Sequence, residues 1–151
     1  MINTLIFDLD GVLVDTKIIH FKALNKALEF YQKGSKIKFH DHVKIYDGLS
    51  TEKKLKILND LKQLKPRFNK KVSKLKQKYT AEFLRKDIKY SKKLFILFKK
   101  LSKEYKICVA TNAVSETLSI CLSKLKIEKF VDFKISNQNV KCPKPHPEIF
   151  L

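Results

Sequence analysis

Short strand-like segments that alternate with helix-like ones constrain the fold of this chain more than any other feature of its sequence. The strand-like segments are residues 4–7, 106–110 and 130–136. Strands that alternate with helices indicate a parallel α/β sheet. In such sheets the chemistry gathers at the carboxyl ends of the strands. We therefore expect an α/β fold whose site residues follow the first two strands.

Two carboxylates stand one residue apart directly after the first of these segments. Because side chains of an extended chain alternate, Asp8 and Asp10 are expected to point the same way. Like charges so close together are costly unless a cation or a reaction uses them. One carboxylate can act as nucleophile and the other as proton donor, with a divalent metal neutralising the pair. A polar turn is the alternative, since turns collect Asp and Gly for local reasons.

The net charge of +18 over 151 residues invites a nucleic-acid interpretation, because clustered cations gain from the release of counterions at phosphates. Nearly all of the basic residues are lysines, and the only arginines are Arg67 and Arg85. Recognition of base edges favours the planar fork of arginine. The lysines are also spread along the whole chain. We therefore expect a positive field that attracts phosphorylated small molecules, and we do not expect nucleic acid to be the main partner.

Cysteine usage and hydropathy point to the cytoplasm. The three cysteines, Cys108, Cys121 and Cys142, form neither a CxxC pair nor a zinc spacing, so we expect reduced thiols without a metal or redox role. No apolar run approaches the roughly 18 residues that a membrane span needs. The N-terminus does not have the pattern of a signal peptide.

Apolar spacing predicts helices in the rest of the chain. One helix is expected from about residue 16 to residue 34, with Phe30 on its apolar face. Residues 36–86 have the pattern of a lysine-rich helical lobe. Its leucine stripe recurs at positions 55, 58, 61 and 64. Two further amphipathic helices flank the second strand.

Three local patterns occur in order along the chain: Asp8-Leu9-Asp10-Gly11-Val12, Thr111-Asn112, and Lys144-Pro145-His146-Pro147-Glu148-Ile149-Phe150. In this combination the sequence resembles the haloacid dehalogenase-like (HAD) hydrolase superfamily. Within it, the resemblance is to the branch of small-molecule phosphatases and beta-phosphoglucomutase. It covers nearly the whole chain, and implies a Rossmann-like parallel core in residues 1–15 and 87–151 with a small helical cap inserted at 16–86.

The resemblance implies a role for each carboxylate. Asp8 would attack phosphorus to form an aspartyl-phosphate, and Asp10 would protonate the leaving oxygen and later deprotonate water. Mg²⁺ is the expected cofactor, held by the Asp8 carboxylate and the Asp10 carbonyl oxygen, because hard oxygen ligands suit it. The second aspartate favours phosphoryl transfer, since it supplies the acid that a poor leaving group needs.

Three later residues are implied as phosphate ligands. Thr111 and the backbone of Asn112 would hold phosphoryl oxygens, and Lys144 would place positive charge against the transition state. Taken alone, Thr111 suits a strand end, Asn112 suits a turn, and Lys144 is one lysine among many. Their joint occurrence with Asp8 and Asp10 favours the functional interpretation.

Within the helical cap, the resemblance points to His20, Gly48 and Ser50 as substrate-binding residues. His20 lies where many sugar-phosphate-acting relatives carry a histidine, which would position substrate or move protons during closure. A helix-face histidine without a role is the alternative. The segment containing Gly48 and Ser50 resembles the cap loop that faces the substrate.

The residue after that serine departs from the pattern of the mutases. In beta-phosphoglucomutase-like proteins an arginine there grips the second phosphate of the substrate, whereas this chain has Thr51. The departure favours a plain phosphatase. Lys53, Lys54 and Lys76 are candidate substitutes for the arginine, but we expect each of them to be a solvated charge.

The family completes its metal site with acidic residues beyond the last motif, and this sequence stops at Leu151. We therefore expect a fragment, with a naturally shortened relative as the alternative. The predicted function is Mg²⁺-dependent hydrolysis of a phosphomonoester on a small metabolite. The alternatives are a sugar-phosphate mutase and an inactive relative that binds anions or nucleic acid.

Overall fold

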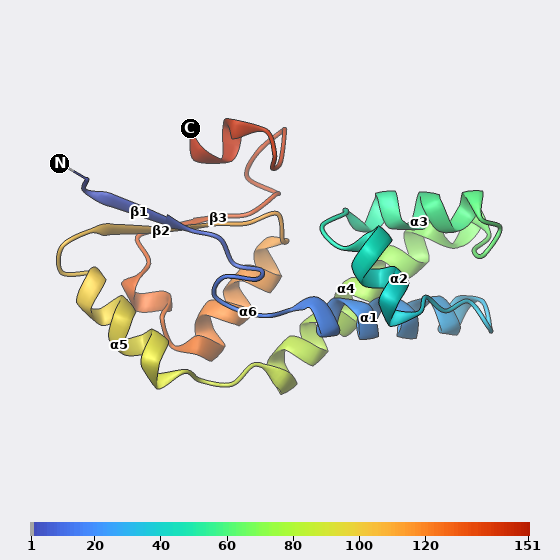
Figure 1. Ribbon diagram of the computed structural model, residues 1–151, viewed down its shortest axis with the longest axis horizontal. Helices are drawn as coiled ribbons and strands as arrows, with labels where there is room; N and C mark the ends of the chain where they lie inside the picture. The colour runs from blue at the N-terminus through green and yellow to red at the C-terminus, as the bar shows by residue number, and fades with distance from the viewer. Residues whose placement is uncertain (1) are drawn as a thin grey trace. The chain divides into compact units, whose positions relative to one another are not determined.

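The computed structural model describes residues 2–151 and divides the chain into two units (Figure 1). The first unit combines the N-terminal segment through Thr16 with Leu84–Leu151. The second unit is Lys17–Phe83. Among the described residues, none of the helices has the length and apolar character needed to cross a membrane.

The first unit is built on a three-stranded parallel sheet in the order β1-β2-β3. Strand β1 covers Thr4–Phe7, β2 covers Lys106–Ala110 and β3 covers Phe133–Ile135. The expected α/β fold with a parallel sheet is thus confirmed. The third strand is shorter than expected, because the 3₁₀ turn Glu128–Phe130 uses the backbone amide of Val131.

Two helices, α5 (Lys92–Leu101) and α6 (Ser115–Leu125), lie on one face of this sheet in Figure 1. The register explains how α5 packs there. Phe7 pairs with Val109, so both side chains point to the same face, and the Phe7 ring lies 5.0 Å from that of Phe98 in α5. This contact fixes the strand end from which the first site residues emerge.

The opposite face of β2 holds the C-terminal segment. Cys108 and Ala110 alternate with the residues that face α5, and they pack against Ile149, which is buried. Ile149 belongs to the short 3₁₀ helix η4 (Pro147–Phe150). This apolar contact brings the lysine-bearing motif of the C-terminal segment back to the end of β2.

The second unit is helical throughout its regular elements. They are α1 (Lys17–Tyr31), α2 (Phe39–Asp41), the π-helical turn His42–Tyr46, α3 (Thr51–Asp60), the 3₁₀ turn Pro66–Phe68 and α4 (Asn69–Asp87), whose last residues belong to the first unit. Their apolar faces form one cluster, with buried members at Leu24, Ala27, Leu28, Ile37, Tyr46, Leu55, Leu58, Leu64 and Val72.

Two sequence-based expectations for this unit are wrong. The leucine stripe does not run along one helix, because α3 ends at Asp60 and Lys62 takes a left-handed φ of +56°. Leu61 is therefore turned outward and is 55% exposed. Phe30 is 68% exposed, since it stands two residues from buried Leu28 and so faces the far side of α1.

Candidate active site

The loop after β1 holds the first carboxylate in place. Asp8 follows the last residue of the strand, and its Oδ1 accepts a hydrogen bond of 2.7 Å from the Leu9 amide. The Gly11 amide then donates to the Val14 carbonyl at 2.7 Å, which folds the loop back on itself. Gly11 has φ +79°, a conformation that glycine adopts without strain. The glycine thus serves the turn that presents the carboxylates.

Asp10 is oriented by a residue that the sequence analysis treated only as a helix start. The Thr16 hydroxyl, which is buried, donates a short hydrogen bond to Asp10 Oδ1. The charge of Asp10 also acts on the protein interior. The pKa of Cys121 in α6 is raised to about 12, first by burial and then by the negative charge of Asp10. Asp10 is therefore held at the edge of the packed core.

Lys144 joins the C-terminal motif to the first strand. Its Nζ lies 3.1 Å from Asp8 Oδ1 and donates a 2.8 Å hydrogen bond to the Ala110 carbonyl at the end of β2. The ammonium group is thus held between two strand ends by two oxygen acceptors. Such a group lowers the cost of placing further negative charge beside Asp8.

Asn112 positions the backbone of Lys144 rather than its charge. Its Nδ2 donates to the Lys144 carbonyl at 3.0 Å, and its Oδ1 accepts from the Lys144 amide at 2.9 Å. These two bonds link segments 32 residues apart. The peptide bond between Lys144 and Pro145 is cis. The Asn112 side chain therefore joins the end of β2 to the loop that carries Lys144, residues 141–146, which we call the lysine loop. We call this pair of hydrogen bonds the Asn112 clasp.

Thr111 lies inside the turn that leaves β2. Its hydroxyl oxygen accepts from the Ala113 amide at 3.0 Å, and its own amide donates to the Ile135 carbonyl at 2.9 Å. The residue is 0% exposed. In this structure its side chain lies at the strand end and bonds to the backbone of the turn.

The remaining predicted site residues, His20, Gly48 and Ser50, lie in the second unit. His20 Nδ1 is 3.4 Å from Lys76 Nζ. Ser50 caps α3, where its hydroxyl accepts from the Lys53 amide at 3.3 Å. Gly48 has φ +72° and turns the chain before that cap. The structure thus gives local roles to Gly48 and Ser50 and a basic neighbour to His20.

Two lysines of the second unit are buried, against our expectation of solvated charges. Lys54 is 8% and Lys76 is 7% exposed, whereas Lys53 is exposed as expected. Burial lowers the pKa of Lys54, and the charge of Asp47 opposes that shift. The expectation failed because Lys54 lies on the packed face of α3 and Lys76 on that of α4. Which face of a helix is packed depends on the surrounding elements more than on the polarity of one side chain.

His42 is a buried basic residue that the sequence analysis did not single out. It is 1% exposed, and its Nδ1 has no hydrogen-bond partner among the described residues. Its pKa is lowered to about 4, first by burial and then by the charge of Lys54, and Asp47 partly offsets this. A single histidine in a lysine-rich segment carries no periodic signal that would have identified it.

The first unit offers oxygen donors suited to a hard divalent cation. The Asp8 side chain is partly exposed, so it is reachable from solvent beside Lys144. The backbone carbonyl of Asp10 adds a neutral oxygen two residues further on. A carboxylate and a carbonyl are the ligand types that Mg²⁺ prefers, and its remaining positions are commonly filled by water and substrate phosphate. The donor set therefore fits such an ion.

The sheet is parallel, two aspartates follow its first strand, and Lys144 from a distant motif pairs with Asp8. In parallel α/β folds, ligands commonly bind at the carboxyl ends of the strands, where these residues lie. The model of the haloacid dehalogenase-like hydrolase family matches residues 5–151. The chain belongs to this family, and it is a HAD-like hydrolase.

Three relatives show what the chain is similar to. A phosphorylated carbohydrates phosphatase from Thermotoga maritima is 30% identical, over 99% of this chain and 68% of its own length. The crystal structure of beta-phosphoglucomutase from Clostridium difficile is 26% identical with a TM-score of 0.73, covering 99% of this chain and 68% of that one. A predicted phosphoglycolate phosphatase from Haemophilus somnus, at 18% identity, shares the fold with a TM-score of 0.82, over 99% and 68% of the two chains.

Proposed function

We propose that this protein hydrolyses a phosphomonoester on a small metabolite through a covalent phosphate on Asp8. The observation that carries the proposal is the contact of 3.1 Å between Lys144 Nζ and Asp8 Oδ1. Asp10, two residues after Asp8, is oriented by the hydroxyl of Thr16. The proposed nucleophile Asp8 and the proposed acid Asp10 thus lie on the loop after β1, and the cation Lys144 reaches Asp8 from the C-terminal motif. This is the set that phosphoryl transfer needs.

The proposed reaction has two steps. Asp8 attacks phosphorus while the bond from phosphorus to the leaving oxygen breaks, and Asp10 gives its proton to that oxygen. Water then attacks the phosphorus, Asp10 takes the proton, and the bond from phosphorus to Asp8 breaks to release phosphate. The hydrogen bond from Thr16 orients the Asp10 carboxylate, to which we assign both proton transfers. Lys144 stabilises the charge that accumulates on the phosphoryl oxygens.

We also propose that Mg²⁺ is the cofactor, held by the Asp8 carboxylate and the Asp10 carbonyl oxygen. When bound, the ion would neutralise charge on the phosphoryl group and orient it. Lys144 contacts the same Asp8 carboxylate, so the lysine and the ion would both act on the charge of this side chain. The Asn112 clasp keeps the lysine loop in register with this site.

A phosphorylated carbohydrate is the substrate class that we propose. The relative from Thermotoga maritima carries that activity in its name, and the net charge of +18 attracts anions of this kind. His20, Gly48 and Ser50 in the helical unit would contact the sugar. A sugar-phosphate mutase is the second candidate, since the Clostridium difficile relative is a beta-phosphoglucomutase. Thr51 argues against it, because no arginine follows Ser50.

The test is phosphate release from a panel of sugar phosphates in Mg²⁺, with Asp8→Asn beside the unchanged protein. Asp8→Asn removes the nucleophile but keeps the side-chain shape, so we expect release to fall to background while the folded spectrum persists. Asp60→Asn, an exposed carboxylate at the end of α3, is the matched control and should retain full activity. Release that survives in Asp8→Asn would refute the assignment.

Glucose 1-phosphate with a bisphosphate primer distinguishes the two enzymes. A mutase converts it to the 6-phosphate, whereas the proposed phosphatase releases inorganic phosphate. Salt-dependent nucleic-acid binding without any phosphate release would instead favour the inactive anion-binding relative.

A further inference from the structure

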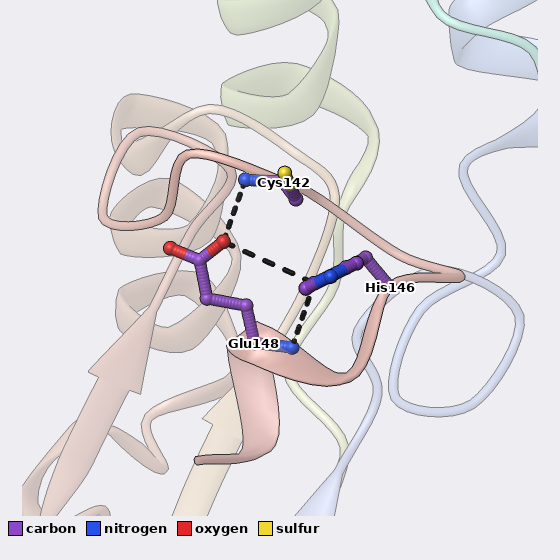
Figure 2. A group of neighbouring side chains, drawn as sticks. All are labelled: Cys142, His146 and Glu148. Atoms are coloured by element: carbon purple, nitrogen blue, oxygen red, sulfur yellow. Dashed lines mark hydrogen bonds and ion pairs between the residues drawn. The ribbon is translucent and has the colours of Figure 1, made fainter.

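A second group of ligand-type side chains lies on the loop that carries Lys144. Figure 2 shows Cys142, His146 and Glu148 around one turn of this loop. One ligand atom from each, the thiol sulfur, a ring nitrogen and a carboxylate oxygen, all lie within 4.8 Å of one another. Cys142 and His146 are exposed and Glu148 is half-buried, so an ion can enter from solvent.

The loop holds this geometry by its own hydrogen bonds. The two Glu148 oxygens accept from the amides of Lys141 and Cys142, each at 2.8 Å, which anchors the carboxylate under the cysteine. His146 Nδ1 accepts from the Glu148 amide at 3.2 Å and lies 3.9 Å from Glu148 Oε2. The Glu148 carboxylate and the His146 ring are therefore held beside the backbone of Cys142.

The donor types select the ion. Thiolate and imidazole favour zinc over magnesium, which prefers oxygen ligands alone. Zinc bond lengths of about 2.0–2.3 Å place tetrahedral ligand atoms about 3.5 Å apart, so closure from 4.8 Å requires a movement of about 1 Å. Exposed side chains on one loop can make that movement by rotation.

We propose that this loop binds Zn²⁺ through Cys142 Sγ, a ring nitrogen of His146 and a carboxylate oxygen of Glu148, with water in the fourth position. On binding, the Cys142 thiol gives its proton to solvent and the sulfur forms the bond to zinc. If Nδ1 is the ligand, zinc replaces the hydrogen bond that this nitrogen accepts from the Glu148 amide. The site uses other atoms than Asp8 and Asp10.

The sequence alone offers no reason to expect this site. The spacing is Cys-x₃-His-x-Glu with no second cysteine nearby, and the cysteines were expected to have no metal role. The grouping arises because Glu148 folds back onto the amides of residues 141 and 142. Lys144 stands between the proposed ligands, so a bound zinc ion would also stiffen the segment that carries this lysine.

Cobalt(II) titration of the full chain in excess Mg²⁺ tests the proposal directly. Cobalt takes the place of zinc and gives a thiolate charge-transfer band only when sulfur is a ligand. We expect this band at one equivalent, its loss on adding zinc, and its absence in Cys142→Ser. Cys108 and Cys121 are buried, so Cys142 is the accessible thiol among the three cysteines. This readout is independent of catalysis.

Zinc affinity, measured by competition with a chromophoric chelator, completes the test. We expect Cys142→Ser and His146→Asn each to weaken binding at least about 10-fold, since even outer-sphere partners of a metal cost roughly 10–100-fold. Asn at position 146 still suits the start of η4. His40→Asn, at an exposed histidine of the second unit, should leave the affinity unchanged. A missing cobalt band, or affinity that survives in either loop variant, would overturn the site.

Discussion

The two units hold their basic side chains in opposite ways. In the first unit, Lys144 is held by the Asp8 carboxylate and a main-chain carbonyl at 3.1 and 2.8 Å. In the second unit, Lys54 and His42 are buried, and burial lowers the pKa of both. Asp47 is the opposing charge for both, and its carboxylate also pairs with Lys17 at 3.2 Å. In the first arrangement oxygen acceptors balance the charge of the lysine, whereas in the second burial disfavours the charged form of each basic group.

Among the changes that test this comparison, loss of the paired lysine should have the largest effect, and it should fall mainly on catalysis. We expect Lys144→Met to reduce phosphate release by about 10²–10³-fold, the usual cost of removing one preorganised charge or donor from a transition state. The clasp from Asn112 uses only the backbone of residue 144, so the melting temperature should change little. Lys103→Met, at an exposed lysine, is the control. A large loss of stability would show that Lys144 is structural.

Acid should weaken the helical unit through His42. Its pKa is about 4 in the folded protein, against an ordinary value of 6.5 for the unfolded chain, so the unfolded chain binds more protons between these values. The contribution of His42 to the free energy of unfolding is therefore fully present above pH 6.5. It falls as the pH drops toward 4, by about 3 kcal/mol at 1.36 kcal/mol per pKa unit. Urea unfolding across this range measures the slope.

The matched pair for that measurement is His42→Leu and His40→Asn. The first removes the buried titrating group and should flatten the pH dependence, while the second changes an exposed histidine and should leave it intact. An unchanged slope in His42→Leu would mean that other groups titrate on unfolding.

The clasp should affect both stability and activity. Asn112→Ala removes two hydrogen bonds to the backbone of Lys144, and we expect a loss of about 1–3 kcal/mol in unfolding free energy. Phosphate release should fall as well, because the lysine loop is no longer held at the end of β2. Thermal unfolding and phosphate assays on one preparation check both, and an effect on activity alone would argue that Asn112 acts on substrate directly.

The smallest effect is expected at the buried lysine, and it has the opposite sign. Lys54→Met removes a buried charge but keeps the length of the side chain, so we expect stability to rise by about 1 kcal/mol. Lys53→Met, at the exposed neighbour, should change stability by less than about 0.5 kcal/mol. Destabilisation by Lys54→Met would show that the ammonium has a favourable role in the fold.

The first two strands were predictable, because each is a short apolar run that alternates with helix-like segments. Strands β1 and β2 begin and end as expected. The burial of Lys54 was not predictable, because the apolar pattern of α3 does not reveal which polar residue its neighbours will cover. The bond from Thr16 to Asp10 spans a turn whose geometry depends on Gly11. Such contacts follow from backbone shape, and periodicity does not encode them.

The Asn112 clasp also bears on how this protein can vary. Because both bonds run to main-chain atoms of Lys144, they place no demand on the identity of the side chain at position 144. Position 112 in contrast needs an amide that donates and accepts at once, so aspartate would lose one of the two bonds. Among natural variants, we expect substitutions at position 144 to leave the fold intact. We expect substitutions at position 112 to be rare even in variants that have lost catalytic activity, because the fold itself needs this side chain.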